Sequence, residues 1–216
     1  MAHKGYNEGC LAAHALDLIG DRWALLVIRE LMLGPKRFGL IKAGLPGIAS
    51  NILTQRLADL EANGLVERRP LTPPAPALAY ALTEAGHETR PVIEALCRWG
   101  VRQPGHDPRK FISPTGLMLS MGVMVRPVET EAEAAFTMGP ESFETRLGPQ
   151  GFTARPGPGA AAPLRFEGSG NALAAAVYGS APLGAHLAAG RLRLTGDPQA
   201  AQRFLDAFSL VPIPAA

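Results

Sequence analysis

The stretch GIASNILTQRLADLEANGLVERR, residues 47–69, has the spacing of an amphipathic helix and an unusual outer side. Three leucines fall on one stripe of a helical wheel, which predicts a face packed against a core: Leu53, Leu57 and Leu60. The opposite side carries Asn51 and Gln55, with Thr54 beside them. Because a helix that only covers a core more usually has Glu and Lys there, this side is a candidate binding surface.

The segments around this helix predict a winged helix-turn-helix. Helices are expected at residues 10–19, at 22–33 with Asp21 as cap, and at 37–43. Gly64 is expected to end the quoted helix. Strands are expected at 65–69 and 77–82 around the loop PLTPPAP, followed by a last helix from Thr83 to Trp99. A short helix, a tight turn, a second helix and a hairpin, in that order, are typical of this fold.

The residue types on the outer side suit double-stranded DNA. Amide and hydroxyl groups both donate and accept hydrogen bonds, so they can read base edges in the major groove. The groove candidates are Ser50, Asn51, Thr54, Gln55 and Arg56, and the phosphate candidates are Lys36, Arg37, Arg68 and Arg69. The alternative is an ordinary solvated helix face, and the order of elements favours DNA reading. The formal net charge of +2 would not by itself indicate a nucleic-acid partner.

The run ALDLIGDRWALLVIRELMLGPKRFGLIKAGLPGIASNILTQRLADLEANGLVERR resembles the HxlR-type transcriptional regulators, winged-helix relatives of the MarR group. The resemblance covers roughly residues 8–101. It implies that the helix beginning near Ile48 is the recognition helix, and that a homodimer binds a pseudo-palindromic operator with half-sites about one DNA turn apart. One feature departs from the family: the wing tip LTPPAPA has no cation. The phosphate contact is therefore expected at the base of the wing.

Two cysteines lie far apart and form neither a CxxC nor a zinc pattern. Cys10 precedes LAAHALDLIG, where HxlR-type proteins commonly carry a cysteine that in some members senses oxidants or quinones. A thiol at the start of a helix is favoured as thiolate, which makes Cys10 a candidate redox sensor. The alternative, a small residue packed at a dimer contact, is slightly preferred. Cys97 is expected in the core.

The predicted fold class is α+β, with two domains. Residues 1–102 form the winged helix-turn-helix, 103–111 a linker around QPGHDPRK, and 112–216 a second domain. Ser113 and Asp197 are expected to begin helices, and short strands are expected at AFTM, FETRL, FTARP, LRFE and RLRLT. This order and the ending LAAGRLRLTGDPQAAQRFLDAF resemble the sterol carrier protein type 2 domain, an α/β fold with a lipid-sized apolar cavity. The resemblance covers about residues 112–210.

A hydrophobic small-molecule effector is the expected ligand of this second domain. The candidate lining residues are large and apolar: Met118, Met121, Phe136, Phe152, Phe166, Leu187 and Phe204. The alternative is a filled core in which these side chains pack on one another. To regulate DNA binding, the effector must prefer one geometry of the dimer.

Other classes of protein are less compatible with the sequence. No nucleophile–base pair, metal spacing or phosphate loop indicates an enzyme, and no cofactor or metal is expected. No apolar run approaches the roughly 20 residues of a membrane span, and no secretory signal is visible, so a cytoplasmic protein is expected. The rival interpretation is a small-molecule or lipid carrier whose winged helix serves protein contacts. The sequence leaves repression or activation open.

Overall fold

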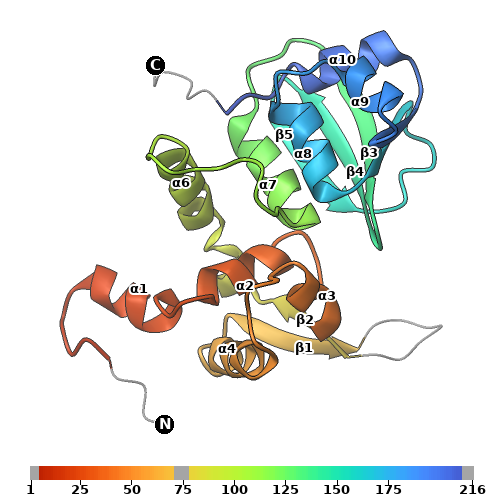
Figure 1. The fold of residues 1–216 in the computed structure, drawn as a ribbon. Coiled ribbons are helices and arrows are strands. Elements are labelled where there is room, and N and C mark those ends of the chain that lie inside the picture. The colour runs from red at the N-terminus through yellow and green to blue at the C-terminus, as the bar shows by residue number, and fades with distance from the viewer. Residues whose placement is uncertain (1–4, 71–77, 211–216) are drawn as a thin grey trace. The chain divides into compact units, whose positions relative to one another are not determined.

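The computed structural model describes residues 5–70 and 78–210. The chain forms two compact units, Met1–Ile93 and Glu94–Ala216 (Figure 1). The expected linker, 103–111, falls inside the second unit, and the expected division into domains at this linker stays a prediction. The wing-tip loop falls largely within residues 71–77, outside the described residues.

The first unit has the predicted order of elements. Its helices and strands are α1 (Leu11–Ile19), α2 (Ala24–Leu31), α3 (Phe38–Ala43), α4 (Ser50–Ala62), β1 (Val66–Pro70), β2 (Leu78–Leu82) and α5 (Glu84–His87). Helix α6 (Arg90–Gly100) crosses the division between the units. The strands pair antiparallel, as a wing requires, with Arg68 opposite Tyr80. The winged helix-turn-helix prediction is confirmed.

Helix α4 packs through the predicted stripe. Leu53, Leu57 and Leu60 are buried, and the helix contacts α2 and β1. At its end Gly64 has a φ of 71°, and the N–H of Leu65 donates to the carbonyl of Leu60 at 2.9 Å. This is the Schellman arrangement, in which the left-handed position favours glycine. The prediction that Gly64 ends the helix is confirmed.

Two local predictions in the first unit are wrong. Asp21 does not cap α2 with its side chain, because the helix begins later, with Trp23 as its N-cap at a φ of 81°. The helix expected from Thr83 to Trp99 is divided into α5 and α6. Thr83 does cap α5, accepting from the N–H of Gly86 at 3.1 Å. Pro91 explains the break, because it has no N–H to donate to the preceding turn.

The second unit places helices on a five-stranded sheet. Its elements are α7 (Pro114–Met124), β3 (Ala132–Met138), β4 (Glu141–Gly148), β5 (Gly151–Pro156), β6 (Leu164–Gly168), α8 (Gly170–Tyr178), α9 (Leu183–Ala188), β7 (Leu192–Thr195) and α10 (Pro198–Leu205). The strand order is β5-β4-β3-β6-β7, with only β3 and β6 parallel. All five expected strands are present, and Ser113 and Asp197 cap α7 and α10 as predicted.

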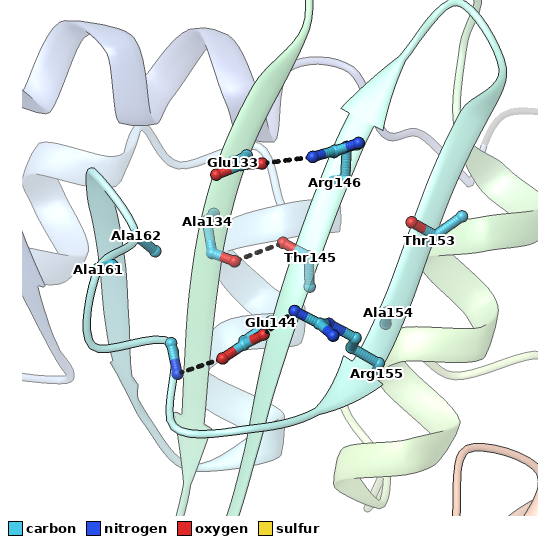
Figure 2. Close-up of a pocket in the computed structure, with 11 residues that line it drawn as sticks. Glu133, Ala134, Glu144, Thr145, Arg146, Thr153, Ala154, Arg155, Ala161 and Ala162 are labelled. Carbon is cyan, nitrogen blue, oxygen red and sulfur yellow. Dashed lines mark hydrogen bonds and ion pairs between the residues drawn. The ribbon is translucent and has the colours of Figure 1, made fainter.

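One face of this sheet is covered and the other is open. Helices α7, α8 and α9 contact β5, β6 and β7, respectively. The side chains beneath them are apolar, with Phe136 stacked on Phe166 at a ring-centroid distance of 4.9 Å. On the opposite face the strands carry charged residues in cross-strand pairs, which are visible in Figure 2. This alternation along each strand is typical of a sheet with one solvated face.

Candidate nucleic-acid interface

The outer side of α4 carries uncharged polar side chains in the open. Ser50, Asn51, Thr54 and Gln55 are all exposed, because the leucine stripe fixes the opposite side against α2 and β1. The Thr54 hydroxyl donates to the Ser50 carbonyl at 3.0 Å, and the Gln55 amide donates to Asp59 Oδ1 at 2.7 Å. Among the described residues, the Asn51 side chain has no hydrogen-bond partner. Its donor and acceptor groups are therefore available to a ligand.

Arg56, which was expected to contact the DNA major groove, lies to the side of this surface. Its guanidinium pairs with Asp21, ahead of α2, and with Asp59 Oδ2 at 2.9 Å. The side chain is largely covered, with 17% exposure. The structure thus gives Arg56 the role of joining α4 to the segment before α2. Sequence spacing alone missed this pairing, since Asp21 and Arg56 are 35 positions apart.

Lys36, expected to contact phosphate, is buried. Its ammonium donates to Glu30 Oε2 at 3.0 Å, and only 7% of its side chain is exposed. It is therefore not placed to reach a phosphate. Arg37, the N-cap of α3, is exposed and remains suited to that contact. Lys42, which was not expected to contribute, donates to the Ser50 hydroxyl and joins α3 to the start of α4.

The base of the wing carries the two expected arginines. Arg68 Nη2 lies 3.1 Å from Glu61 Oε2, and its guanidinium lies over the Tyr80 ring at 5.8 Å. Arg69 pairs with Glu67. Both arginine side chains remain about half exposed, at 48% and 60%. Exposed pairs of this kind are weak, so a phosphate can replace the carboxylate.

The two cysteines have different surroundings. Cys10 is exposed and forms the N-cap of α1. The backbone N–H groups of Ala13 and Ala12, at the start of this helix, lower the pKa of its thiol. Cys97 is partly covered on α6 rather than fully buried as expected.

The seven candidate effector residues lie mostly in one packed cluster. Met118, Met121, Phe136, Phe166 and Phe204 are almost fully buried, Phe152 is nearly so, and Leu187 is partly exposed. The Phe204 ring lies 6.1 Å from that of Phe136 and 6.2 Å from that of Phe166. This arrangement matches the filled-core alternative at these side chains.

A polar groove of about 590 Å³ lies instead on the open face of the sheet (Figure 2). Arg146 pairs with Glu133 at 2.9 Å, and Arg155 pairs with Glu144 at 2.6 Å. The loop at Gly159–Ala162 forms one wall, held where the Gly159 N–H donates to Glu144 Oε1 at 3.2 Å. None of the seven candidate residues lines this groove.

Two further observations concern the described parts of the chain. Within residues 5–70 and 78–210, no group of three or more His, Cys, Asp or Glu side chains is placed to hold a metal ion. None of the helices described combines the length and the apolar character that a bilayer crossing requires.

The fold and the exposed polar side of α4 define a winged helix-turn-helix protein. The family model for HxlR-like helix-turn-helix proteins matches residues 18–107. The HTH-type transcriptional regulator YkvN of Bacillus subtilis (strain 168) is 40% identical over 84 residues, which cover 39% of this chain and 71% of YkvN. The regulator sll1512 of Synechocystis sp. is 37% identical over 91 residues, which cover 42% of this chain and 67% of that protein.

Among solved structures, the reduced form of the transcriptional regulator YodB from B. subtilis is 36% identical. The match covers 46% of this chain and 100% of that one, with a TM-score of 0.40. From the sequence relatives, the chain belongs to the HxlR-like helix-turn-helix family, whose relatives named above are transcriptional regulators. The family prediction is confirmed for the first unit.

Proposed function

We propose that the protein binds a pseudo-palindromic operator in double-stranded DNA as a homodimer. The observation that carries this proposal is the exposed polar side of α4, where Asn51 and Gln55 lie one turn apart. These groups suit base edges in the major groove, while Arg37, Arg68 and Arg69 suit phosphates. Membership of the HxlR-like family favours this function over a carrier whose winged helix serves protein contacts.

Exposed apolar side chains on two helices, α1 and α6, favour a homodimer. On α1, Leu11 is 86% exposed and Leu16 is also exposed. On α6, Val92, Leu96 and Trp99 are exposed at a spacing that places them along one side of the helix. Apolar helix faces of this kind are suited to a partner surface. We assign that partner as a second copy of the chain, because two recognition helices are needed to read the two halves of a palindrome.

A second candidate function, effector binding, concerns the second unit. The second unit combines a five-stranded sheet with helices on one face, which is compatible with the α/β fold that the resemblance to the sterol carrier protein type 2 domain implies. Its interior is rich in Met and Phe, and methionine in particular adapts to a guest because its side chain is unbranched and flexible. A hydrophobic effector would enter this interior by displacing packed side chains. It would then alter the spacing between the two winged helix-turn-helix domains of the homodimer.

The test of DNA binding is selection from a random duplex pool, followed by titration at increasing salt. We expect a selected sequence with two related half-sites, and an affinity that falls steeply with salt because phosphate contacts release counterions. Sedimentation of the protein alone and with this duplex gives the number of copies bound. Failure to select any sequence, or binding that does not respond to salt, would contradict the proposed function.

The effector proposal has its own test. A panel of hydrophobic compounds is added, and thermal unfolding is followed. Binding to the native state must raise the unfolding temperature. If no compound does so, the second unit serves as a dimerisation or scaffold domain.

A further inference from the structure

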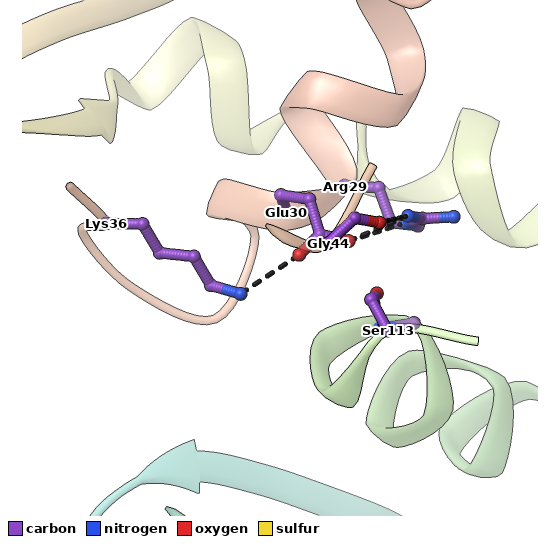
Figure 3. A network of polar contacts seen from close by, with 6 residues as sticks. Arg29, Glu30, Lys36, Gly44 and Ser113 are labelled. Atoms are coloured by element: carbon purple, nitrogen blue, oxygen red, sulfur yellow. Dashed lines mark hydrogen bonds and ion pairs between the residues drawn. The ribbon is translucent and has the colours of Figure 1, made fainter. Parts of the chain in front are cut away.

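The first unit contains a fully buried carboxylate. The side chain of Glu30, on α2, has 0% exposure. Its two oxygens serve different cations: Oε1 accepts from Arg29 Nη2 at 2.7 Å, and Oε2 accepts from Lys36 Nζ at 3.0 Å (Figure 3). The sequence signal for this cluster is an acidic residue inside the apolar helix ALLVIREL.

From this carboxylate one path of contacts leads to the wing. The backbone of Lys36 pairs in both directions with Tyr80 of β2, through two N–H···O bonds of 2.9 Å. Tyr80 is in turn opposite Arg68 of β1, whose guanidinium lies over its ring. A shift of Lys36 would therefore move Tyr80, and with it Arg68 at the base of the wing.

A second path leads to the recognition helix. Gly44 begins the turn between α3 and α4, and it lies so close to Glu30 that a Cβ there would clash with the carboxylate. Arg29 Nη2 also reaches the Gly44 carbonyl, at 3.4 Å. Glu30 and its partners thus contact the turn that leads into Ser50 and Asn51.

The free energy of folding alone does not account for this cluster. Removing ions from water is costly, and apolar residues of similar volume often stabilise a core as well or better. A buried ion pair has the additional property that its distances and directions are fixed. We propose that Glu30 is a positioning residue for DNA recognition, which sets the placement of α4 relative to the base of the wing. This inference rests on the proposed DNA binding.

The test replaces the buried Glu30–Lys36 pair, so that no buried ammonium is left alone, while Arg29 keeps its charge on a side chain that is 23% exposed to water. The variant Glu30→Leu/Lys36→Met removes both ions and keeps the volume nearly constant. Its matched control is Glu133→Leu/Arg146→Met, the corresponding change at an exposed ion pair of the second unit. The probe is the duplex selected by the wild-type protein, compared with a duplex of random sequence, and unfolding by urea establishes that each variant is folded.

We expect the preference of the Glu30→Leu/Lys36→Met variant for the selected duplex to fall about tenfold or more, because base contacts depend on the placement of α4. Binding to random DNA, which depends on phosphate charge, should change little, and the control should retain its preference. A folded variant with full preference would overturn the inference while leaving the proposed function intact. Wild-type protein without any sequence preference would overturn both.

A second variant covers the case in which the double variant does not fold. Gly44→Ala keeps every charge and displaces the carboxylate by one added methyl group. Gly39→Ala on α3, where nothing lies within 4 Å of an added Cβ, is its control. We expect Gly44→Ala to lose sequence preference and Gly39→Ala to retain it. Equal preference in the two folded variants would refute the positioning role.

Discussion

The two units contain similar ion pairs in opposite surroundings. In the first unit Glu30 and Lys36 lie 3.0 Å apart with at most 7% of either side chain exposed. In the second, Glu133 and Arg146 lie 2.9 Å apart, and more than half of each side chain is exposed. The distances are almost equal, so access to water is the difference. Removing one partner should therefore lower the free energy of unfolding much more at the buried pair than at the exposed pair.

The largest effect is expected for Glu30→Leu, which leaves the Lys36 ammonium buried without its carboxylate. Breaking a buried pair in this way typically costs about 3–5 kcal/mol in the free energy of unfolding. Urea unfolding followed by tryptophan fluorescence, to which Trp23 of the first unit and Trp99 both contribute, measures the loss. Adding Lys36→Met should restore much of the stability. A loss below about 1 kcal/mol for the single variant would mean that water reaches the pair.

The next effect concerns the exposed groups of α4. Asn51→Ala and Gln55→Ala should each weaken binding to the selected duplex by about 1–3 kcal/mol, and binding to random DNA far less, because base contacts are lost. Titration of both duplexes measures the difference. Unchanged sequence preference in both alanine variants would show that α4 is not the recognition helix.

Arg68→Ala should behave differently from the α4 variants. Loss of one phosphate contact should weaken binding to the selected and random duplexes alike, and should reduce the slope of log affinity against log salt by about one unit. Titration over a range of salt concentrations checks both points. The double variant Glu30→Leu/Lys36→Met gives a useful contrast, since the ammonium of Lys36 is buried and its removal should leave the salt slope on random DNA unchanged.

A smaller effect is expected for Glu133→Gln on the open sheet face. Because both partners are exposed and screened, the change in unfolding free energy should be about 0.2–1 kcal/mol. Urea unfolding at low and high salt measures it, and the difference from wild type should shrink as salt rises. A loss as large as that of Glu30→Leu would remove the contrast between the two units.

The smallest effect is expected for Cys10→Ser, which should retain DNA binding and the response to an effector. Cys10 is exposed, and no described cysteine is bonded to it. Oxidant treatment of wild type, followed by a DNA shift assay, is the measurement. Loss of binding on oxidation, prevented by Cys10→Ser and reversed by thiol, would instead make Cys10 a redox sensor, in line with its lowered thiol pKa.

The sequence by itself determined most of the elements and their order. The stripe of Leu53, Leu57 and Leu60, the glycine at position 64 and the caps at Ser113 and Asp197 are all where expected. Each of these features depends on residues within a few positions, because helix periodicity, capping and turn geometry are local properties. The same reason explains why the exposed polar side of α4 was predictable.

The tertiary structure alone decided which charges are available. Arg56 and Lys36 are cations in the sequence like Arg68, yet one is paired with Asp21 and the other is buried on Glu30. The tertiary structure also decided that the large apolar side chains of the second unit pack on one another. Burial and pairing depend on segments brought together by folding, and no local pattern records which segments meet. The candidate site was thus predictable as a surface, while the availability of its individual charges was not.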